Sequence, residues 1–316
     1  NDGNSDLQPD WVWIKNRSTS GKDHNLYDSS RGTTKQLNSN NSNAENTVST
    51  SLTAFNSDGF TLGADGGPNA NSDSHVAWQW KANGGTTTTN DASATGVGSL
   101  DSVYQANTTA GFSIVTYTGQ GGNQTIAHGL GAVPNMILIR RRDDAGDWTS
   151  YHSVLGDEKF MRLNSTNGVG DQATYFNDTT PTSTVFTVGN AGDVNTSSGT
   201  HVAYCFTDIQ GYSKFGSYKG NGNADGPFIY LGFKPKYFLL KNATASSGTG
   251  GQHWQISDTE RHPDNPLDLT LFAEDNAAEG GTWSIKDFLS NGVKIRGDNY
   301  AMNTSNDTYI YMAFAE

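Results

Sequence analysis

The feature that most constrains this chain of 316 residues is an internal repeat that occurs three times. Each copy contains a proline followed by an apolar segment, at residues 9–16, 134–141 and 235–242. Each copy also closes with a second apolar segment, at residues 75–80, 201–206 and 309–314. Because self-similar segments adopt the same supersecondary unit, the chain is expected to fold as three related copies.

The spacing of the copies places a longer connection between the first and the second. The prolines that begin the second and third copies are 235 − 134 = 101 positions apart, whereas those of the first and second copies are 134 − 9 = 125 positions apart. The surplus falls in residues 83–110, whose Gly, Thr, Asn and Ser content is typical of a flexible linker. The expected organisation is a first repeat at 1–82, a linker at 83–110, a second repeat at 111–210 and a third repeat at 211–316.

The first repeat lacks a segment that the other two share. Residues 111–119 and 211–220 are similar openings, and nothing in the first repeat matches them. The chain begins at Asn1 without an initiator methionine or a leader segment, and it stops directly after a closing segment. We therefore expect an N-terminally truncated first repeat in a sequence that is a fragment or a processed product.

Within each copy, short runs rich in Val, Ile, Thr, Phe and Tyr alternate with clusters of Gly, Asn, Asp and Ser, which is the pattern of strands and turns. Strict alternation places Ile114 and Thr116 on one face of a strand and Val115 and Tyr117 on the other. The sequence predicts an all-β fold of tandem β-sandwich, jelly-roll-like repeats, with about seven strands in each and little helix. A short helix or a turn is expected within residues 267–279.

Charge and composition exclude several classes of function. Acidic residues outnumber basic ones by 32 to 20, a formal net charge of −12, which disfavours binding to nucleic acid. No apolar run approaches the roughly 20 residues that a membrane helix needs. Cys205 is the single cysteine, so it can form neither an intrachain disulfide nor a zinc knuckle alone. Stability is therefore expected to come from packing.

The sequence assigns no catalytic residue. It contains no Gly-x-Ser-x-Gly elbow, His-Glu-x-x-His helix or Walker loop. His75 and His201 occupy the same repeat position, and because Tyr309 replaces them in the third copy, a packing role is favoured there. The remaining histidines are scattered, at positions 24, 128, 152, 253 and 262. Three pairs of adjacent carboxylates occur, Asp143-Asp144, Asp157-Glu158 and Glu274-Asp275. Neighbours in sequence do not flank one glycosidic bond, but a glycosidase built from distant carboxylates stays open.

No metal, cofactor or ligand-binding residue is assigned either. Residues 221–226, Asn-Gly-Asn-Ala-Asp-Gly, superficially resemble a calcium loop but lack a downstream bidentate Glu, so a turn is favoured. Among the tryptophans, those in the repeated segments are expected in the core, as are Trp148 and Trp254, which align roughly with Leu26. Trp283 has no equivalent and is the least explained. The Asn-x-Ser/Thr sequons at Asn164 and Asn195 receive no functional weight.

Three segments of the repeats carry a family resemblance: residues 127–134 (Ala-His-Gly-Leu-Gly-Ala-Val-Pro), 211–222 and 309–316. They resemble a repeat domain of bacteriophage virion proteins, which recurs, often in tandem, in tail fibres and other virion-surface components of marine and other phages. The resemblance covers nearly the whole chain outside residues 83–110. It implies an extracellular location on the virion surface and a structural or host-adhesion role, and it brings no activity, cofactor or functional residues with it.

The leading hypothesis is a non-enzymatic tail-fibre or spike segment that contacts other virion proteins and a host-surface glycan or receptor. β-Modules joined by a flexible segment would present an extended multivalent surface, and multivalency raises avidity without new contacts. Two alternatives are a polysaccharide-degrading tailspike enzyme and a purely architectural capsid or tail decoration. A homotrimer, frequent among phage fibres, is left open because no heptad pattern demands a threefold axis.

Overall fold

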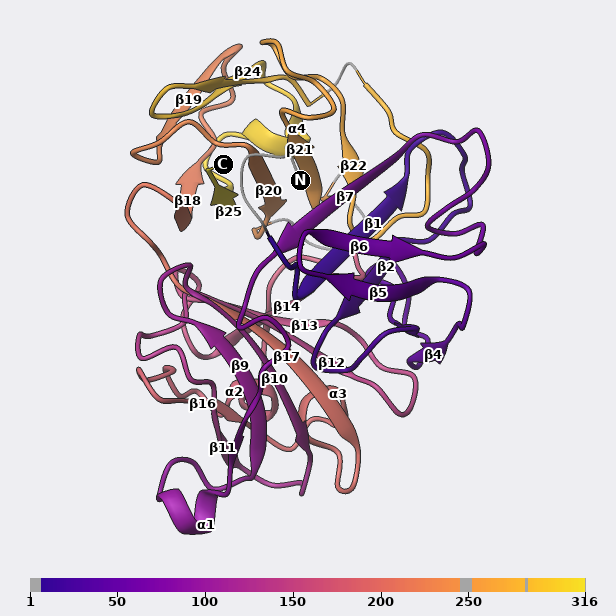
Figure 1. Ribbon diagram of the computed structural model, residues 1–316. Helices are drawn as coiled ribbons and strands as arrows, with labels where there is room; N and C mark the ends of the chain where they lie inside the picture. Colours follow the sequence, from indigo (N-terminus) through magenta and orange to yellow (C-terminus); the bar gives the residue numbers. More distant parts are fainter. Residues whose placement is uncertain (1–6, 245–251, 282–283, 316) are drawn as a thin grey trace.

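The computed structural model describes residues 7–244, 252–281 and 284–315. Strands make up 41% of the chain and helices 5%, and the strands form several antiparallel sheets, so the expected all-β class is confirmed. Figure 1 shows three lobes around a common centre, with the first repeat in indigo and purple, the second mainly in magenta and the third in orange to yellow.

Within the described residues 7–82, the first repeat contains only strands: β1 (Trp11–Asn16), β2 (Asn25–Asp28), β3 (Lys35–Gln36), β4 (Asn46–Thr47), β5 (Leu52–Asn56), β6 (Gly59–Leu62) and β7 (His75–Trp80). Residues 83–110 contain β8 (Thr88–Asn90), α1 (Ala92–Thr95) and β9 (Ser102–Asn107).

The second repeat comprises β10 (Phe112–Thr118), β11 (Gln124–Ala127), β12 (Met136–Arg141), β13 (Thr149–His152), β14 (Lys159–Arg162), β15 (Gly170–Asp171), α2 (Ala173–Phe176), β16 (Val185–Val188), α3 (Gly192–Asn195) and β17 (Thr200–Phe206). The third comprises β18 (Ser213–Lys219), β19 (Asp225–Tyr230), β20 (Tyr237–Asn242), β21 (Gln255–Asp258), β22 (Leu271–Phe272), β23 (Lys286–Leu289), β24 (Gly292–Arg296), α4 (Tyr300–Asn303) and β25 (Thr308–Phe314).

The repeated segments build the same three-stranded unit three times. The strand orders are β2-β1-β7, β13-β12-β17 and β21-β20-β25, with the proline-initiated strand in the middle each time. The registers also coincide, since Trp13 pairs with Trp78 in the first repeat as Leu138 pairs with Tyr204 in the second. The sequence alignment of these segments therefore corresponds to a structural equivalence.

One face of each unit contributes to a core that all three repeats share. Trp11 and Trp13 of β1, Leu138 of β12 and Leu239 of β20 lie in a single buried cluster. Successive side chains of a strand point to opposite faces, so the intervening Val12 faces a separate outer cluster. The expectation of extended modules on a flexible connection is wrong, because a common centre of large side chains joins the copies.

The outer faces are covered within each repeat. Hairpin β5–β6 covers Val12 and Ile14 of the first repeat through Phe55 and Phe60. The corresponding outer clusters of the second and third repeats include strands β11 and β16, and β19, β23 and β24, respectively. Each central strand is therefore buried on both faces, which explains its nearly continuous apolar sequence.

The ring of three repeats closes head to tail through buried cations on the central strands. Each cation donates to a backbone carbonyl of a neighbouring repeat: Lys15 to Asn276, Arg140 to Asn43 and Lys241 to Ser165. The first repeat therefore binds the third, the second binds the first and the third binds the second, which is a closed heterologous arrangement. Burial lowers the pKa of Lys15 and of Lys241 to about 8 and that of Arg140 to about 10.

Residues 83–110 are an ordered part of the second repeat's sheet, not a linker. β9 pairs with β10 and β8 pairs with β9, which extends that sheet to eight strands. The Asp10 carboxylate accepts the backbone N–H groups of Ala82, Gly84 and Gly85 at 2.7–2.8 Å. Gly84 and Gly85 have φ of +62° and +77°, which glycine adopts without strain. The Gly-rich sequence thus serves a tight turn around a buried carboxylate.

Residues 267–279 contain a turn, one of the two alternatives expected there; it follows the short strand β22, and the described segment has no helix. One further expectation needs correction. Trp148 and Trp254 are fully buried, as expected, but the residue equivalent to them is His24, because each precedes the strand that pairs with the central strand. Leu26 lies two positions further along, opposite Trp13.

Candidate functional site

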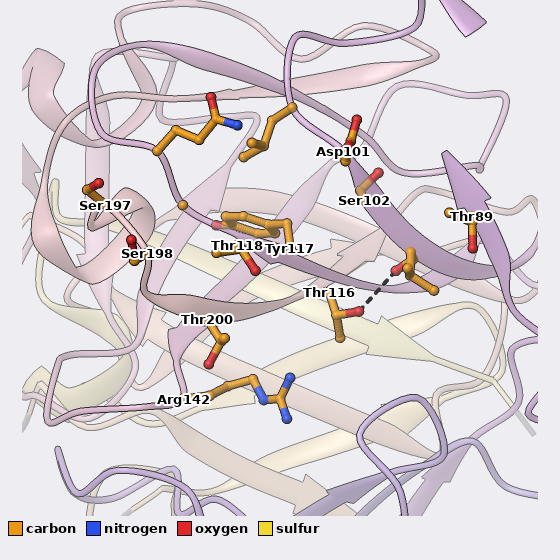
Figure 2. Close-up of a pocket in the computed structure, with 14 residues that line it drawn as sticks. Thr89, Asp101, Ser102, Thr116, Tyr117, Thr118, Arg142, Ser197, Ser198 and Thr200 are labelled. Carbon is orange, nitrogen blue, oxygen red and sulfur yellow. Dashed lines mark hydrogen bonds between the residues drawn. The ribbon is translucent and has the colours of Figure 1, made fainter. Parts of the chain in front are cut away.

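A groove of about 640 Å³ opens on the second repeat beside β8, β9, β10 and β17 (Figure 2). This volume is within the roughly 300–1,000 Å³ typical of small-molecule sites. Its walls come from residues 100–103, the end of β10 with the turn at 119–120, and the turn at 197–200. Gly119 permits the close approach of the last two, because a Cβ there would lie 2.3 Å from the Thr196 carbonyl oxygen. Residues 83–110 supply one wall, so the groove depends on their order.

Neutral hydroxyl groups dominate the lining. Those of Thr116 and Ser102 donate to the Val103 and Ala127 carbonyls. The Tyr117 hydroxyl donates to the Val194 carbonyl at 2.7 Å. Within the described chain, the hydroxyls of the remaining lining residues form no hydrogen bond to a protein group: Thr89, Thr118, Ser197, Ser198 and Thr200. A hydroxyl both donates and accepts, so this set can bind a neutral polar ligand without a charged partner.

The charged residues of the groove are already engaged. Asp101 accepts the backbone N–H of Ala92 at 2.8 Å. Arg142 forms a bidentate pair with Glu45, with both N–O distances at 3.0 Å. Burial alone would raise the pKa of Glu45, but the hydrogen bonds and charges of Arg142 and Arg31 lower it. The groove therefore offers a bound cation and a bound carboxylate, and its free groups are neutral.

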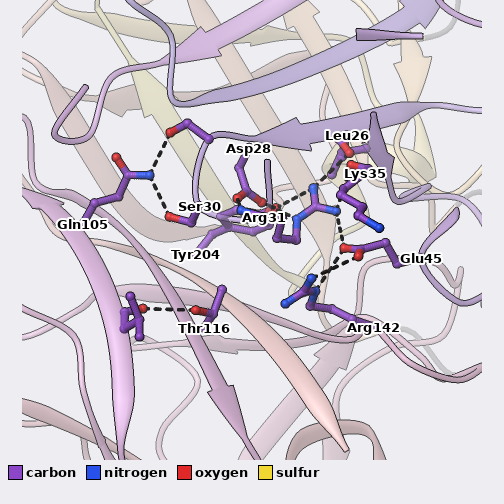
Figure 3. A network of polar contacts seen from close by, with 12 residues as sticks. Leu26, Asp28, Ser30, Arg31, Lys35, Glu45, Gln105, Thr116, Arg142 and Tyr204 are labelled. Carbon is purple, nitrogen blue, oxygen red and sulfur yellow. Dashed lines mark hydrogen bonds and ion pairs between the residues drawn. The ribbon is translucent and has the colours of Figure 1, made fainter. Parts of the chain in front are cut away.

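Arg142 connects the groove to a buried polar network between the first and second repeats (Figure 3). Arg31 pairs with Asp28 and, at 2.9 Å, with Glu45. Tyr204 of the second repeat donates its hydroxyl to Asp28 Oδ2 at 2.6 Å. Although burial opposes the charged form, Asp28 and Glu45 raise the pKa of Arg31 above its ordinary value.

The same network recurs between the third and first repeats. Arg261 pairs with Asp258 and Glu279, each at 2.6 Å, and Glu279 pairs with Arg17 at 2.8 Å. Trp78 takes the place of Tyr204 and donates its indole N–H to Asp258 Oδ2 at 2.9 Å. The shared signal is Asp-x-x-Arg at the end of β2 and of β21, which a comparison of the repeats could have found.

The interface between the second and third repeats has the same backbone arrangement, with a histidine and a leucine in place of the aspartate and the arginine. His152 ends β13, where Asp28 ends β2, and Leu155 follows at the position of Arg31. The Val169 N–H donates to the Ala243 carbonyl just as the Glu45 N–H donates to that of Arg142. Burial lowers the pKa of His152 to about 4, so this interface carries a neutral imidazole.

The structure places the histidines and carboxylates that the sequence singled out in local contacts. His201 stacks on Tyr117 with centroids 5.0 Å apart, and Tyr309, its equivalent, stacks on Tyr218 at the same distance. This geometry agrees with the packing role expected for that position. Each carboxylate pair is held locally by an ion pair or a hydrogen bond from a neighbouring group. In the described part of the chain, no cluster of three or more His, Cys, Asp or Glu side chains is arranged to hold a metal ion.

The loop at residues 221–226 closes on itself. Asn221 Oδ1 accepts the Asn223 N–H, and Asn223 Oδ1 accepts the Asp225 N–H. The buried Asn303 amide donates to Asn221 Oδ1 and to the Asn223 carbonyl, so these oxygens stabilise a turn. Asn195, whose sequon was singled out above, is fully buried and donates to the Gly189 carbonyl in the same way that Asn303 donates to that of Gly297. Trp283 lies outside the described residues.

The hydroxyl groove was not found by sequence reasoning, because its residues come from five separated segments and carry no motif. On a separate point, no helix in the described residues combines the length and apolarity that crossing a bilayer requires.

The fold defines an all-β protein built from three internal repeats around one core, with a neutral polar groove on the second. The chain belongs to the family described as domain of unknown function (DUF7483), whose model matches residues 3–316. No curated protein and no solved structure matches it.

Proposed function

We propose that this protein is a structural component of a phage virion surface, a tail-fibre or spike segment, that binds a neutral glycan of the host surface in the groove of the second repeat. The observation that carries the proposal is the set of free hydroxyls at Thr89, Thr118, Ser197, Ser198 and Thr200. Sugars present the same donor-and-acceptor groups, so such a lining exchanges hydrogen bonds with them without the cost of burying an unpaired charge.

The charge of the groove supports a neutral ligand over an anionic one. Arg142, the one cation among the described lining residues, is paired with Glu45, and the whole chain carries a net charge of −12. An anionic polysaccharide would meet a repulsive field with no free cation to offset it. The motifs at residues 127–134, 211–222 and 309–316 support the virion-surface location.

The polysaccharide-degrading alternative has less support from the same groove. Hydrolysis of a glycosidic bond uses two carboxyl groups on opposite sides of the bond. Asp101 is the only carboxylate among the lining residues described, and it already accepts a backbone N–H. A binding role uses all the groups present, whereas hydrolysis needs a second acid.

For the fold of each copy, we propose a sandwich in which the three-stranded unit and the outer strands enclose one of the outer clusters. The separate outer clusters of the three repeats support this description. The second repeat is the copy that best supports a jelly-roll-like sandwich, because the pair β11–β16 covers the outer face of its three-stranded unit. An experimental structure tests it directly through the strand connections.

The test is a glycan array probed with the purified chain, followed by titration with any ligand found. Thr118→Trp would fill the groove, and Lys219→Trp, at the equivalent position of the third repeat, is the matched control. We expect Thr118→Trp to lower the affinity at least tenfold and Lys219→Trp to leave it unchanged. No binding across a broad panel would favour an architectural role, equal binding by both variants would place the site elsewhere, and release of reducing ends would favour the enzyme.

A further inference from the structure

The first repeat has an open sheet edge where the other two repeats have a strand. β17 is flanked by β12 and β10, and β25 is flanked by β20 and β18. β7 is their equivalent, and in the described part of the chain it pairs with β1 alone. The open side of β7 is the side that β10 occupies on β17 and that β18 occupies on β25.

The backbone of β7 is oriented to accept such a neighbour. The carbonyls of Trp80 and Ser74 accept the N–H groups of Asp10 and Arg17, so the even-numbered residues direct their backbone groups toward β1. Because these groups alternate along a strand, His75, Ala77 and Gln79 direct theirs to the opposite edge. Among the described residues, none forms a hydrogen bond with the N–H or C=O groups of these three.

A groove of about 530 Å³ runs along this edge. It is lined by the length of β7, with Trp78 and Trp80, and by Tyr237 and Phe314 of the third repeat. Ala77 is half-buried there, whereas its equivalents Ala203 and Tyr311 are buried. The groove and the exposure both mark the place of a missing strand.

The two seated strands show what such a strand contacts. Phe112 of β10 packs on Trp11 of the first repeat, and Phe215 of β18 packs on Phe206 of the second, each with centroids 5.9 Å apart. Each opening strand therefore reaches the repeat before it in the ring. A strand on β7 would reach the third repeat in the same way, and Tyr237 and Phe314 line the groove at that point.

The ring stacks at the other end of the strand add a second requirement. Tyr117 lies opposite His201 and stacks on it, and Tyr218 lies opposite Tyr309 and stacks on it. His75 occupies the equivalent position in β7, opposite Asn16 of β1, without an opening strand beside it. A tyrosine is therefore the residue that fits opposite His75.

We propose that the open edge of β7 accepts an extended segment of a partner polypeptide as an antiparallel strand. The segment carries a large apolar residue opposite Trp78 and, three positions later, a tyrosine opposite His75. Both seated strands have this pattern, as Ile-Val-Thr-Tyr at residues 114–117 and Phe-Gly-Ser-Tyr at residues 215–218. Main-chain hydrogen bonds supply affinity in this mode of recognition, and alternate side chains in pockets supply specificity.

A separate partner segment fits this edge better than the corresponding strand of a second copy. β10 is bonded on both sides, by β9 and β17. The Phe215 side chain of β18 is buried in the shared core, at 3% exposure. Moving either strand into a second copy would break strand pairing that is already complete and would expose buried apolar side chains. The inference does not depend on the groove of the second repeat, so the glycan experiment and this one can fail separately.

The probe is a labelled nine-residue peptide with the sequence of residues 111–119, Gly-Phe-Ser-Ile-Val-Thr-Tyr-Thr-Gly. We expect saturable binding to the intact chain by fluorescence anisotropy. A peptide carrying Ile114→Asn and Tyr117→Asn should bind at least tenfold more weakly. In the protein, Ala77→Pro removes an outward N–H without touching the ladder to β1 and should also weaken binding at least tenfold, whereas Ala77→Ser keeps that N–H and should bind normally.

Hydrogen exchange on the unaltered protein keeps the test independent of whether Ala77→Pro folds. The peptide should slow exchange of the amides of His75, Ala77 and Gln79, and leave the amides bonded to β1 unchanged. Absence of saturable binding, equal binding of the two peptides, or protection elsewhere would each overturn the proposal. A concentration-dependent dimer in light scattering, with these amides protected in the dimer, would replace the partner strand by a second copy.

Discussion

Tyr204 and Asp28 belong to different repeats, yet the tyrosine hydroxyl lies 2.6 Å from the carboxylate in a site closed to solvent. Trp78 and Asp258 form the equivalent contact at the next interface around the ring. In both cases the same carboxylate also binds an arginine three residues later in its own repeat. An aromatic donor of one copy therefore hydrogen-bonds to the carboxylate of an ion pair in another copy. At these two interfaces, the buried carboxylate depends on the neighbouring repeat for one of its hydrogen bonds.

The first prediction concerns the buried pair at the interface of the third and first repeats. Asp258→Ala removes the partner of Arg261 and of the Trp78 indole, and a buried pair broken on one side costs about 3–5 kcal/mol. Glu260→Ala is the control, because its pair with Lys236 is at the surface and such pairs contribute about 0–1 kcal/mol. Urea unfolding of both variants measures the difference. Equal midpoints would show that the network does not hold the interface.

The second prediction concerns the turn that follows the first repeat. Asp10→Asn leaves an acceptor oxygen but removes the charge that binds Ala82, Gly84 and Gly85. Hydrogen bonds to charged groups contribute about 1.5–3 kcal/mol, so residues 82–90 should open more readily. Hydrogen exchange with mass spectrometry should show faster exchange there and little change in β20 and β25. Unchanged protection of residues 82–90 would contradict the anchoring role of Asp10.

The third prediction separates backbone strain from crowding at two glycines. Gly131→Ala meets an open space at φ +68° and should cost about 1–2 kcal/mol for the left-handed backbone alone. Gly129→Ala has φ +73°, and its Cβ would also lie 2.2 Å from the Tyr104 ring of β9, adding about 1–3 kcal/mol of overpacking. Thermal unfolding compares the two. A larger loss at Gly131 would mean that Tyr104 does not pack there.

The fourth prediction concerns acid. Burial lowers the pKa of His128, His152 and His201 to about 4, below the ordinary value of 6.5. The unfolded chain therefore binds more protons than the folded chain between pH 6.5 and 4. The free energy of unfolding should fall as the pH falls through that window, by about 1.4 kcal/mol per pH unit for each histidine, and the contribution is fully present above it.

His152→Gln tests one of these three groups. Its unfolding free energy should vary less steeply between pH 6.5 and 4 than that of the parent protein, by about one proton in the slope. Urea unfolding at a series of pH values gives both curves. A parallel pair of curves would show that His152 titrates alike in the folded and unfolded chains.

Much of the fold could be predicted from the sequence because repeated strands carry a visible pattern. Alternation at Ile114 and Val115 predicted opposite faces, and the two residues indeed belong to the shared core and an outer cluster, respectively. The closure of the ring could not be predicted. Strand patterns show that a face is apolar, but they do not show whether it meets the same repeat or another. The turn at Gly84 reads as a linker because the acceptor that orders it, Asp10, is more than seventy residues away.

The candidate groove escaped prediction for a related reason. Thr118, Ser197 and Thr200 are ordinary surface residues in a chain rich in hydroxyls, and only the ordered strand β9 turns them into one concave site. In contrast, the similarity of residues 111–119 and 211–220 is visible in the sequence, and the structure places both beside a closing strand, on the side where β7 has no neighbour among the described residues. The backbone orientation of Ala77, which makes that edge usable, required the structure.

An assembly of three identical chains would have to repeat every change at an interface three times. Covalent joining of the copies removes that constraint, so His152 and Leu155 can occupy one junction while aspartate and arginine occupy the other two. Unequal junctions give each repeat a distinct chemical environment, so a substitution can weaken or specialise one interface without changing the other two.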